Sequence, residues 1–381
     1  MTASDGPAPA APGATSGAGR WPLRYRDHRR DPAAWARRLG VSREAVDLYL
    51  DADVIDLHTC SFIWARMGYD LSRRHRPHLR GTPFFNQVDF PRAREAALTG
   101  IVWDITTNPL RGPEGRRRAF LRNLARLRRL LARHPGELRL VRTPAEYRAA
   151  KAAGLLASWI GVQGGNAVPL DLLDRIPGRA LSRITLVHFT RSELGASATD
   201  PRHRDVGLTR HGREYVARMV AARILVDLSH INRRGFFDAL DAMPRGVPAA
   251  VTHTGMRSLR DVSRNIDDEQ ARAIAATGGT IGVVYQPGFL RPALYDYGIS
   301  DIVDHMQRVI DVAGEDHVSL GSDYDGAVIL PRDLADVTEQ PRLVEAMLRR
   351  GWSHARIRKL LGLNYLRVLD GIQVEALRAS T

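Results

Sequence analysis

The chain has 381 residues, of which 44% are hydrophobic and 26% are charged, the composition of an ordinary globular protein. Its formal net charge of +14 comes almost wholly from arginine, because Lys151 and Lys359 are the only lysines. This uniform skew favours a bias of the whole chain over a nucleic-acid-binding patch. The single cysteine excludes an intramolecular disulfide, and no apolar run approaches the ~20 residues of a bilayer span. We therefore predict a cytoplasmic protein that binds a small molecule and has neither a nucleic-acid nor a membrane partner.

The amino-terminal residues 1–20 are rich in Ala, Gly, Pro, Ser and Thr, and they lack the basic and apolar regions of a signal peptide. This composition predicts a disordered leader, followed by a single domain over residues 21–381. That domain is predicted to begin with a helix at 32–50 and to close with a helical tail at 338–370.

Eight short apolar runs alternate with longer amphipathic stretches, which is typical of repeated βα units. Most of the runs are dense in Val, Ile and Leu without alternation, as in parallel strands covered on both faces. The predicted strands are Asp53–His58, Ile101–Thr107, Leu156–Val162, Ile184–His188, Ile224–His230, Ala249–His253, Thr280–Tyr285 and His317–Asp323. Eight such units predict a fold of the α/β class, a (β/α)₈ TIM barrel.

The amphipathic stretches between the strands predict helices, among them residues 209–222, 267–277 and 302–313. An arginine-rich stretch at residues 116–133 also carries leucines at helical spacing. We interpret it as a helix with a solvated charged face, rather than as a phosphate-binding surface.

Polar residues stand where many of the predicted strands end. Because the carboxyl ends of barrel strands meet at one mouth, we expect these side chains to share a site. Imidazole and carboxylate groups in such a mouth are the usual means of holding a divalent metal that activates water. The residues at the strand ends are His58-Thr59-Cys60, Gln163-Gly164-Gly165-Asn166, His188, His230, His253 and Asp323.

Several longer motifs accompany these strand ends in a fixed order. They are Ile184–His188 (ITLVH), Gly207-Leu208-Thr209, Val226–His230 (VDLSH), Thr252-His253-Thr254, Arg264-Asn265, Gly321–Gly326 (GSDYDG) and Leu361–Asn364 (LGLN). With these motifs, the chain from about Val54 to Leu369 resembles the membrane (renal) dipeptidases, a branch of the amidohydrolase superfamily. The resemblance implies an eight-stranded barrel in which two zinc ions share a bridging glutamate, and an activity that hydrolyses dipeptides.

The resemblance also implies a role for each matching residue. His230 and His253 match the two histidines that bind one zinc ion, and His58 matches the first ligand of the other. His188 matches a histidine that polarises the scissile carbonyl or stabilises the oxyanion. Asp323 matches a carboxylate that takes a proton from water and passes it to the leaving amine.

Two further positions are implied to contact the substrate. Arg264 matches an arginine that grips the free carboxylate of the substrate, for which its planar fork is suited. A substrate-contacting tyrosine of the family falls at Tyr285 or Gln286, and the register between these two positions stays open.

Three residues depart from the family pattern, and all of them fall in the cluster. Cys60 stands where the family has an aspartate ligand, Gln163 replaces the bridging glutamate, and Asn166 replaces a histidine. A neutral amide offers one carbonyl oxygen where a carboxylate offers two anionic oxygens. Because two neighbouring Zn²⁺ ions repel each other unless anions offset their charge, we predict at most one zinc ion.

Two interpretations of the cluster follow. In the first, His230 and His253 hold one zinc ion together with His58, Cys60 or Asp323. In the second, the metal has been lost and Cys60 acts as a nucleophile beside His58. Burial of Cys60 as a small apolar residue is a third reading of that position.

We therefore predict a dipeptidase-like hydrolase of a dipeptide or small amide with a free carboxylate. The alternatives are a metal-independent tailoring enzyme of a biosynthetic pathway, with Cys60 as its nucleophile, and a non-catalytic binding relative that keeps Arg264. The sequence leaves open whether the protein forms a homodimer.

Overall fold

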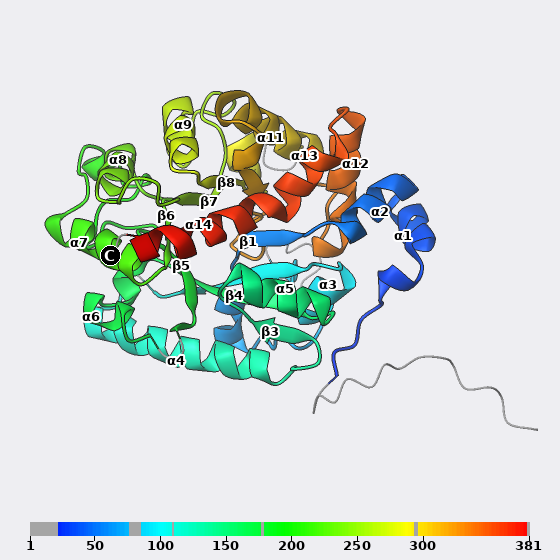
Figure 1. Ribbon diagram of the computed structural model, residues 1–381, viewed down its shortest axis with the longest axis horizontal. Helices are drawn as coiled ribbons and strands as arrows, with labels where there is room; N and C mark the ends of the chain where they lie inside the picture. The colour runs from blue at the N-terminus through cyan, green and yellow to red at the C-terminus, as the bar shows by residue number, and fades with distance from the viewer. Residues whose placement is uncertain (1–21, 76–84, 109, 177–178, 293–295, 379–381) are drawn as a thin grey trace, which may run out of the picture.

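Eight parallel strands close into a barrel in the computed structural model, which describes residues 22–75, 85–108, 110–176, 179–292 and 296–378 (Figure 1). The strands follow the order β2-β1-β9-β8-β7-β6-β5-β4, and pairing between β2 and β4 closes the ring. Their bounds are β1 Ile55–Thr59, β2 Gly100–Thr106, β4 Leu156–Gln163, β5 Leu181–Thr185, β6 Leu225–Asp227, β7 Ala250–Thr254, β8 Thr280–Val283 and β9 Val318–Leu320. The predicted α/β class and eight-stranded barrel are confirmed.

The sequence predicts eight strands, whereas the described residues contain a ninth, β3 (Leu138–Leu140). It pairs with Leu156–Ser158 at the start of β4, and β5 pairs with the same strand from Ile160 onward. β3 therefore adds to the beginning of β4 without entering the closed ring.

Helices surround the barrel and connect its strands (Figure 1). Their bounds are α1 Pro32–Leu39, α2 Arg43–Asp51, α3 Phe90–Glu95, α4 Pro113–Ala132, α5 Pro144–Ala152, α6 Leu170–Leu173, α7 Arg210–Ala221, α8 Arg233–Asp241, α9 Asp268–Ala276, α10 Pro287–Leu290, α11 Ile299–Ala313, α12 Pro341–Arg349, α13 His354–Arg358 and α14 Asn364–Arg378. Short turns of other helix types are η1 His28–Arg30, η2 Ser61–Met67, η3 Gly165–Ala167, η5 Pro201–His203, η6 Glu315–His317, η7 Val337–Glu339 and the π-helical η8 Lys359–Leu363.

The helix predicted at residues 32–50 is two helices, α1 and α2. Gly40 adopts a left-handed φ of +67°, which ends α1. Ser42 then caps α2, because its hydroxyl accepts a hydrogen bond from the backbone N–H of Ala45. The two helices meet at this short corner, which the hydrophobic spacing alone does not reveal.

Apolar side chains form a second core cluster beneath helix α14. Trp159 of β4 and Tyr365 of α14 meet edge to face, with ring centroids 5.8 Å apart. Interior residues from several strands, such as Leu57 and Val102, belong to the same cluster. In Figure 1, α14 crosses in front of the strands. The polar interior residues lie farther along the strands, toward the carboxyl end where barrel enzymes carry their active sites.

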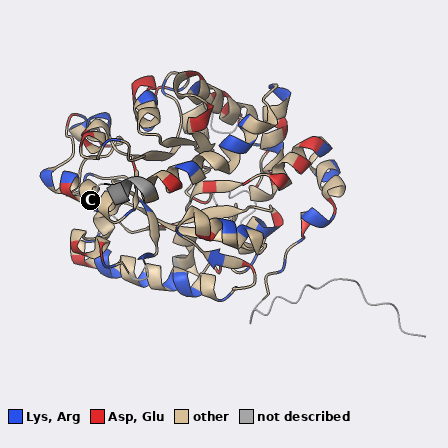
Figure 2. Cartoon of the chain, viewed as in Figure 1, with Lys and Arg blue, Asp and Glu red and all other residues tan. Residues whose placement is uncertain are grey.

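Helix α4 has the amphipathic character that its sequence predicts. Leu124, Leu127 and Leu130 are buried, whereas Arg122 and Arg126 are exposed. Figure 2 shows basic residues along this helix and acidic residues spread over other parts of the surface. That the chain binds no nucleic acid remains a prediction.

The predicted leader at residues 1–20 lies outside the described residues. Within the part of the chain that the structure describes, no helix has both the length and the apolar character that crossing a membrane requires.

Candidate active site at the carboxyl end of the barrel

The predicted site residues come together at the carboxyl ends of the strands. His58 and His253 lie within β1 and β7, and Gln163 is the last residue of β4. His230 and Asp323 each follow their strand by three residues and have left-handed φ angles of +66° and +60°. The strands predicted to end at these two residues therefore end earlier. A left-handed φ in a residue other than glycine costs of order 1–3 kcal/mol, so the surrounding fold must hold both turns in place.

One group of polar atoms lies on the side of β1 and β9. The imidazole Nε2 of His58 is 3.4 Å from the Cys60 sulfur and 3.3 Å from a carboxylate oxygen of Asp323. The donor atoms of these three residues all lie within 4.8 Å of one another. His58 and Cys60 are buried, and the Asp323 side chain is 14% exposed. Nitrogen, sulfur and oxygen donors thus converge on one small volume.

A second group lies on the side of β6 and β7. The Nε2 atoms of His230 and His253 are only 2.8 Å apart. Burial and the nearby charge of Arg264 help to hold the pKa of both histidines well below the usual range, so both rings are neutral. The ring of His253 also stacks on that of His58, with centroids 3.8 Å apart, which joins the two groups.

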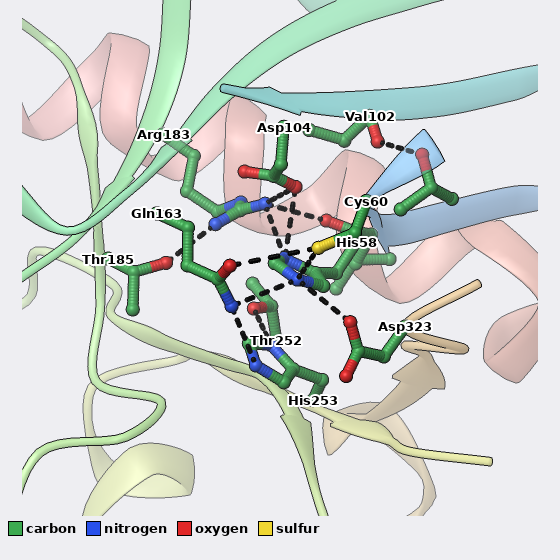
Figure 3. A network of polar contacts seen from close by, with 12 residues as sticks. His58, Cys60, Val102, Asp104, Gln163, Arg183, Thr185, Thr252, His253 and Asp323 are labelled. Carbon is green, nitrogen blue, oxygen red and sulfur yellow. Dashed lines mark hydrogen bonds and ion pairs between the residues drawn. The ribbon is translucent and has the colours of Figure 1, made fainter. Parts of the chain in front are cut away.

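The side chain of Gln163 contacts both groups, and Figure 3 shows its amide pointing toward His58, Cys60 and His253. Its amide nitrogen lies 3.3 Å from Nε2 of His58, 3.1 Å from that of His230 and 3.4 Å from that of His253. Its amide oxygen accepts a hydrogen bond from the Thr106 hydroxyl at 3.1 Å and faces the Cys60 sulfur at 3.7 Å. The neutral amide therefore links all three imidazoles to Cys60.

His188 and Arg264 border the cluster. His188 is partly buried, and its ring packs on those of Phe189 (3.8 Å) and His230 (4.6 Å). Burial, with the charge of Arg264, lowers the pKa of His188 to about 3, so the imidazole is neutral at physiological pH. Arg264 is 7% exposed; it donates to the His253 carbonyl oxygen at 3.3 Å and lies over the Phe289 ring at 5.3 Å. Burial lowers the pKa of Arg264 to about 10, which still leaves it charged.

Tyr285 and Gln286, the two candidates for a substrate-contacting position, both have hydrogen-bond partners in the structure. Tyr285 is buried, and its hydroxyl accepts from Gln340, which also donates to Tyr324. The Gln286 side chain accepts from the backbone N–H of Ile329 at 3.3 Å. Both side chains therefore have partners away from the histidine cluster, and a substrate-contacting role for either stays a prediction.

Asn166, the third departure, is partly buried in the short turn η3. Its backbone carbonyl accepts from the side chain of Arg116 at 3.1 Å. Gly164, which precedes the turn, has a left-handed φ of +96° and lets the chain reverse directly after Gln163.

The donor set fits a single divalent cation. Imidazole, thiolate and carboxylate are all ligands of zinc, and His58, Cys60 and Asp323 present one of each. The group between the two histidine sides is the neutral amide of Gln163, which offers one carbonyl oxygen where a bridging carboxylate offers two anionic oxygens. The predicted grouping of His230 and His253 with a third ligand differs from this arrangement, in which the three close donors are all on the β1 and β9 side.

Burial raises the pKa of the Cys60 thiol to about 12, so the free thiol keeps its proton. This disfavours the alternative in which Cys60 is an activated nucleophile. For His58, burial alone would lower the pKa, but the carboxylate of Asp104 and its other neighbours outweigh burial and hold that pKa well above the usual range.

Charged residues inside the barrel were not singled out from the sequence. Asp104 lies 2.9 Å from Nδ1 of His58 and forms an ion pair with Arg183, which also pairs with Asp227 at 2.9 Å. All three side chains are fully buried. The available signal was a charged residue within each of three apolar strands, β2, β5 and β6.

A cavity of about 470 Å³ adjoins the cluster. His230 and Arg264 are among its lining residues, with Ser229, Asn232 and Arg257. Its lining is mainly polar and charged, so it suits a small polar molecule near Arg264.

Comparison with known proteins places these features in one family. A model of the membrane dipeptidase family, peptidase family M19, matches residues 42–381. An uncharacterised dipeptidase of Schizosaccharomyces pombe is 32% identical over 260 residues, which are 66% of this chain and 62% of the yeast protein. The chain thus spans less than two thirds of that relative.

Solved structures have the same barrel. The dipeptidase AC, a metallopeptidase of family M19, is 27% identical, with a TM-score of 0.74 over 84% of this chain and 98% of its own. A metallopeptidase of Rhodobacter sphaeroides, liganded with a phosphinate mimic of the dipeptide L-Ala-D-Ala, is 25% identical, with a TM-score of 0.72 over 84% of this chain and 99% of its own. From the barrel, the histidine cluster and these matches, the chain belongs to the membrane dipeptidase family, peptidase family M19, and is a hydrolase.

Proposed function

We propose that the protein hydrolyses the amide bond of a dipeptide, or of a similarly small amide with a free carboxylate, and that it uses one divalent cation. The observation that carries this proposal is the convergence of His58, Cys60 and Asp323, whose donor atoms lie within 4.8 Å of one another. Zinc is the cation that this set of nitrogen, sulfur and oxygen donors suits best.

The metal-holding residues would be His58, Cys60 and Asp323. A divalent cation held there supplies Lewis acidity, which makes water a nucleophile near neutral pH. The thiol of Cys60 would lose its proton on binding, because only the thiolate is a strong ligand. The neutral amide of Gln163 adds no charge beside this site, which supports one cation rather than two.

Arg264 would bind the free carboxylate of the substrate. Its guanidinium is buried, retains its charge and borders the cavity of about 470 Å³ next to the cluster. A paired carboxylate would satisfy this buried cation through two parallel hydrogen bonds. The relative from Rhodobacter sphaeroides, which binds a phosphinate mimic of L-Ala-D-Ala, supports a dipeptide with a free carboxylate as the substrate class.

His188 and Asp323 would handle the reacting carbonyl and the protons. A neutral His188 can donate an N–H to the carbonyl oxygen of the substrate as negative charge develops there. The Asp323 carboxylate can accept a proton from the attacking water and return it to the leaving amine. The two roles are based on position: His188 borders the cluster, and Asp323 lies within it.

The direct experiment measures metal content and hydrolysis in purified protein. We expect about one divalent cation per chain by elemental analysis, release of D-Ala from L-Ala-D-Ala, and loss of both after chelation. With Co²⁺ in place of the natural metal, we expect a thiolate-to-metal absorption band that disappears in Cys60→Ser. Protein that holds no metal and hydrolyses no small amide would contradict the proposal.

A further inference from the structure

We infer that Asp104, Arg183 and Asp227 form a buried charge network that holds the ring protons of His58 and His253 on Nδ1, so that both Nε2 lone pairs face the cluster. The three charged residues would be positioning residues, since they act through the two histidines. The inference deepens the proposed function. The positions of the ring protons do not depend on that function, but metal binding by the Nε2 lone pairs does.

Two members of the network, Arg183 and Asp104, lie beside His58 on the side away from Asp323 (Figure 3). Arg183 pairs with Asp104 through Nη2 and with Asp227 through Nη1, and none of the three side chains is exposed. Gly161 of β4 makes the space for it, because a Cβ at this position would clash with Asp104 and lie 2.8 Å from Nη2 of Arg183. With two carboxylates and one guanidinium, the network carries one net negative charge behind the cluster.

At His58, the donors and acceptors around Nδ1 show which ring nitrogen carries the proton. Nδ1 lies 2.9 Å from Asp104 and 3.0 Å from Nη2 of Arg183. That Nη2 has two hydrogens, and it already donates to Asp104 and to the Leu57 carbonyl oxygen at 3.3 Å. Because a carboxylate can only accept, the 2.9 Å contact with Asp104 requires a proton on Nδ1, and the Nη2 hydrogens have Asp104 and Leu57 as acceptors without it. The Nε2 atom then keeps its lone pair when the ring is neutral.

At His253, the hydroxyl group of Thr252 determines which ring nitrogen carries the proton. Nδ1 is 3.0 Å from the hydroxyl oxygen of Thr252, which donates its single hydrogen to Asp227 at 2.7 Å. The oxygen can therefore only accept from His253, which again places the ring proton on Nδ1. Asp227 is fixed in turn by Arg183 at 2.9 Å. One arginine thus reaches both histidines through its two carboxylate partners.

The orientation of Gln163 supports this assignment independently. Its amide oxygen accepts from Thr106, so its NH₂ group faces the imidazoles. The NH₂ group lies 3.3 Å from Nε2 of His58 and 3.4 Å from Nε2 of His253. The NH₂ group has two hydrogens for three nearby Nε2 atoms, that of His230 at 3.1 Å included, and an Nε2 atom can accept one of them only when the single proton of its ring is on Nδ1. His230 has no such support, because its buried Nδ1 has no hydrogen-bond partner among the described residues.

A fixed tautomer matters because the lone pair on Nε2 is what binds a metal. A carboxylate or hydroxyl behind a metal-binding histidine orients the ring and raises its basicity. Here Asp104 would serve His58 directly, and Asp227 would serve His253 through Thr252.

The test reads the tautomers without any metal. In metal-free wild-type protein with ¹⁵N-labelled histidine, long-range ¹H–¹⁵N correlation distinguishes Nδ1–H from Nε2–H rings. His58→Gln and His253→Gln assign the two signals. We expect a proton on Nδ1 in both rings: alone in His253, and alone in His58 once the pH exceeds the raised pKa of that ring. A wild-type ring of either residue with its only proton on Nε2 overturns the inference.

Two variants separate the branches of the network. In Asp104→Leu, which leaves Arg183 paired with Asp227, an Nη2 hydrogen is free to donate to Nδ1 of His58, so the His58 proton should move to Nε2 while His253 keeps its own on Nδ1. In Thr252→Val, which keeps the shape of the side chain, His253 should lose its single tautomer while His58 keeps its own. Affinity for Co²⁺ should fall about 10- to 100-fold in Asp104→Leu. An unchanged His58 tautomer in folded Asp104→Leu would also overturn the inference.

The outcome is independent of catalysis. Rings that carry Nδ1–H in a protein that hydrolyses no amide would contradict the proposed function and leave the network intact. Hydrolysis by a protein whose rings carry Nε2–H would support the proposed function and contradict the network. The two ideas therefore fail separately.

Discussion

The two sides of the histidine cluster differ in the negative charge that stands near them. On the side of β1 and β9, His58 is 3.3 Å from Asp323 and 2.9 Å from Asp104, and the thiol of Cys60 is close by. On the side of β6 and β7, His230 and His253 face each other at 2.8 Å, and the group between the two sides is the neutral Gln163.

Because of this difference, the histidines alone do not make both sides equally suited to a metal ion. A divalent cation in a buried site needs anionic ligands to offset its charge and its loss of hydration. Both sides offer imidazole nitrogens, but among the described residues only the first side brings a carboxylate and an ionisable thiol within reach of them. The β1 and β9 side therefore fits a cation by itself, whereas the β6 and β7 side would need a carboxylate at position 163.

The largest effect is expected from removing the anion on the favoured side. Asp323→Asn changes the charge with little change in shape, and it would remove both the proposed metal ligand and the proposed proton acceptor. We expect kcat for dipeptide hydrolysis to fall by about 10²–10⁴-fold, together with a loss of bound metal. Steady-state kinetics and elemental analysis measure the two effects. Asp241→Asn, on the exposed surface of α8, is the matched control. Full activity in Asp323→Asn would place the chemistry elsewhere.

The second-largest effect is expected when carboxylates are added at position 60, on the β1 and β9 side, and at position 163, between the two sides. Cys60→Asp/Gln163→Glu introduces a carboxylate at two of the three positions where the chain departs from the family pattern. We expect bound metal to rise from about one to about two ions per chain, because a glutamate at position 163 can share its two oxygens between two cations. Elemental analysis and calorimetric titration measure this change, and Gln163→Met is the matched variant without charge. Unchanged metal content in the double variant would mean that charge does not limit the second site.

Much of the barrel could be predicted because its signals are local. Buried strands are apolar runs, and a histidine at the end of such a run is visible in the sequence, as at His188 and His253. Strand β3 (Leu138–Leu140) was missed because three residues are too few to display a period. The division of the first helix at Gly40 depends on one left-handed residue, which hydrophobic spacing does not reveal.

The supporting residues of the site could not be predicted, because their roles depend on partners far away in the chain. Asp104 and Arg183 are separated by 79 positions and come together only when β2 and β5 enter the same barrel. The same holds for Gln163, whose amide links histidines from three other strands or turns. A charged residue in a buried strand indicates that a partner exists, but its identity requires the fold.

The smallest effect is expected from replacing Gly161 of β4, which makes room for Asp104 and Arg183 behind His58. In Gly161→Ala, the new methyl group would clash with Asp104 and approach Nη2 of Arg183 at 2.8 Å. We expect the free energy of unfolding to fall by about 1–3 kcal/mol, the usual cost of overpacking a core. Gly115→Ala in α4 is the matched control, since its nearest neighbour would be 3.5 Å away and the change should stabilise by about 0.4–1 kcal/mol. Denaturant unfolding measures both. A Gly161→Ala protein as stable as wild type would mean that the Asp104–Arg183 pair can move aside, and His58 would then lack the rigid support that distinguishes its side of the cluster.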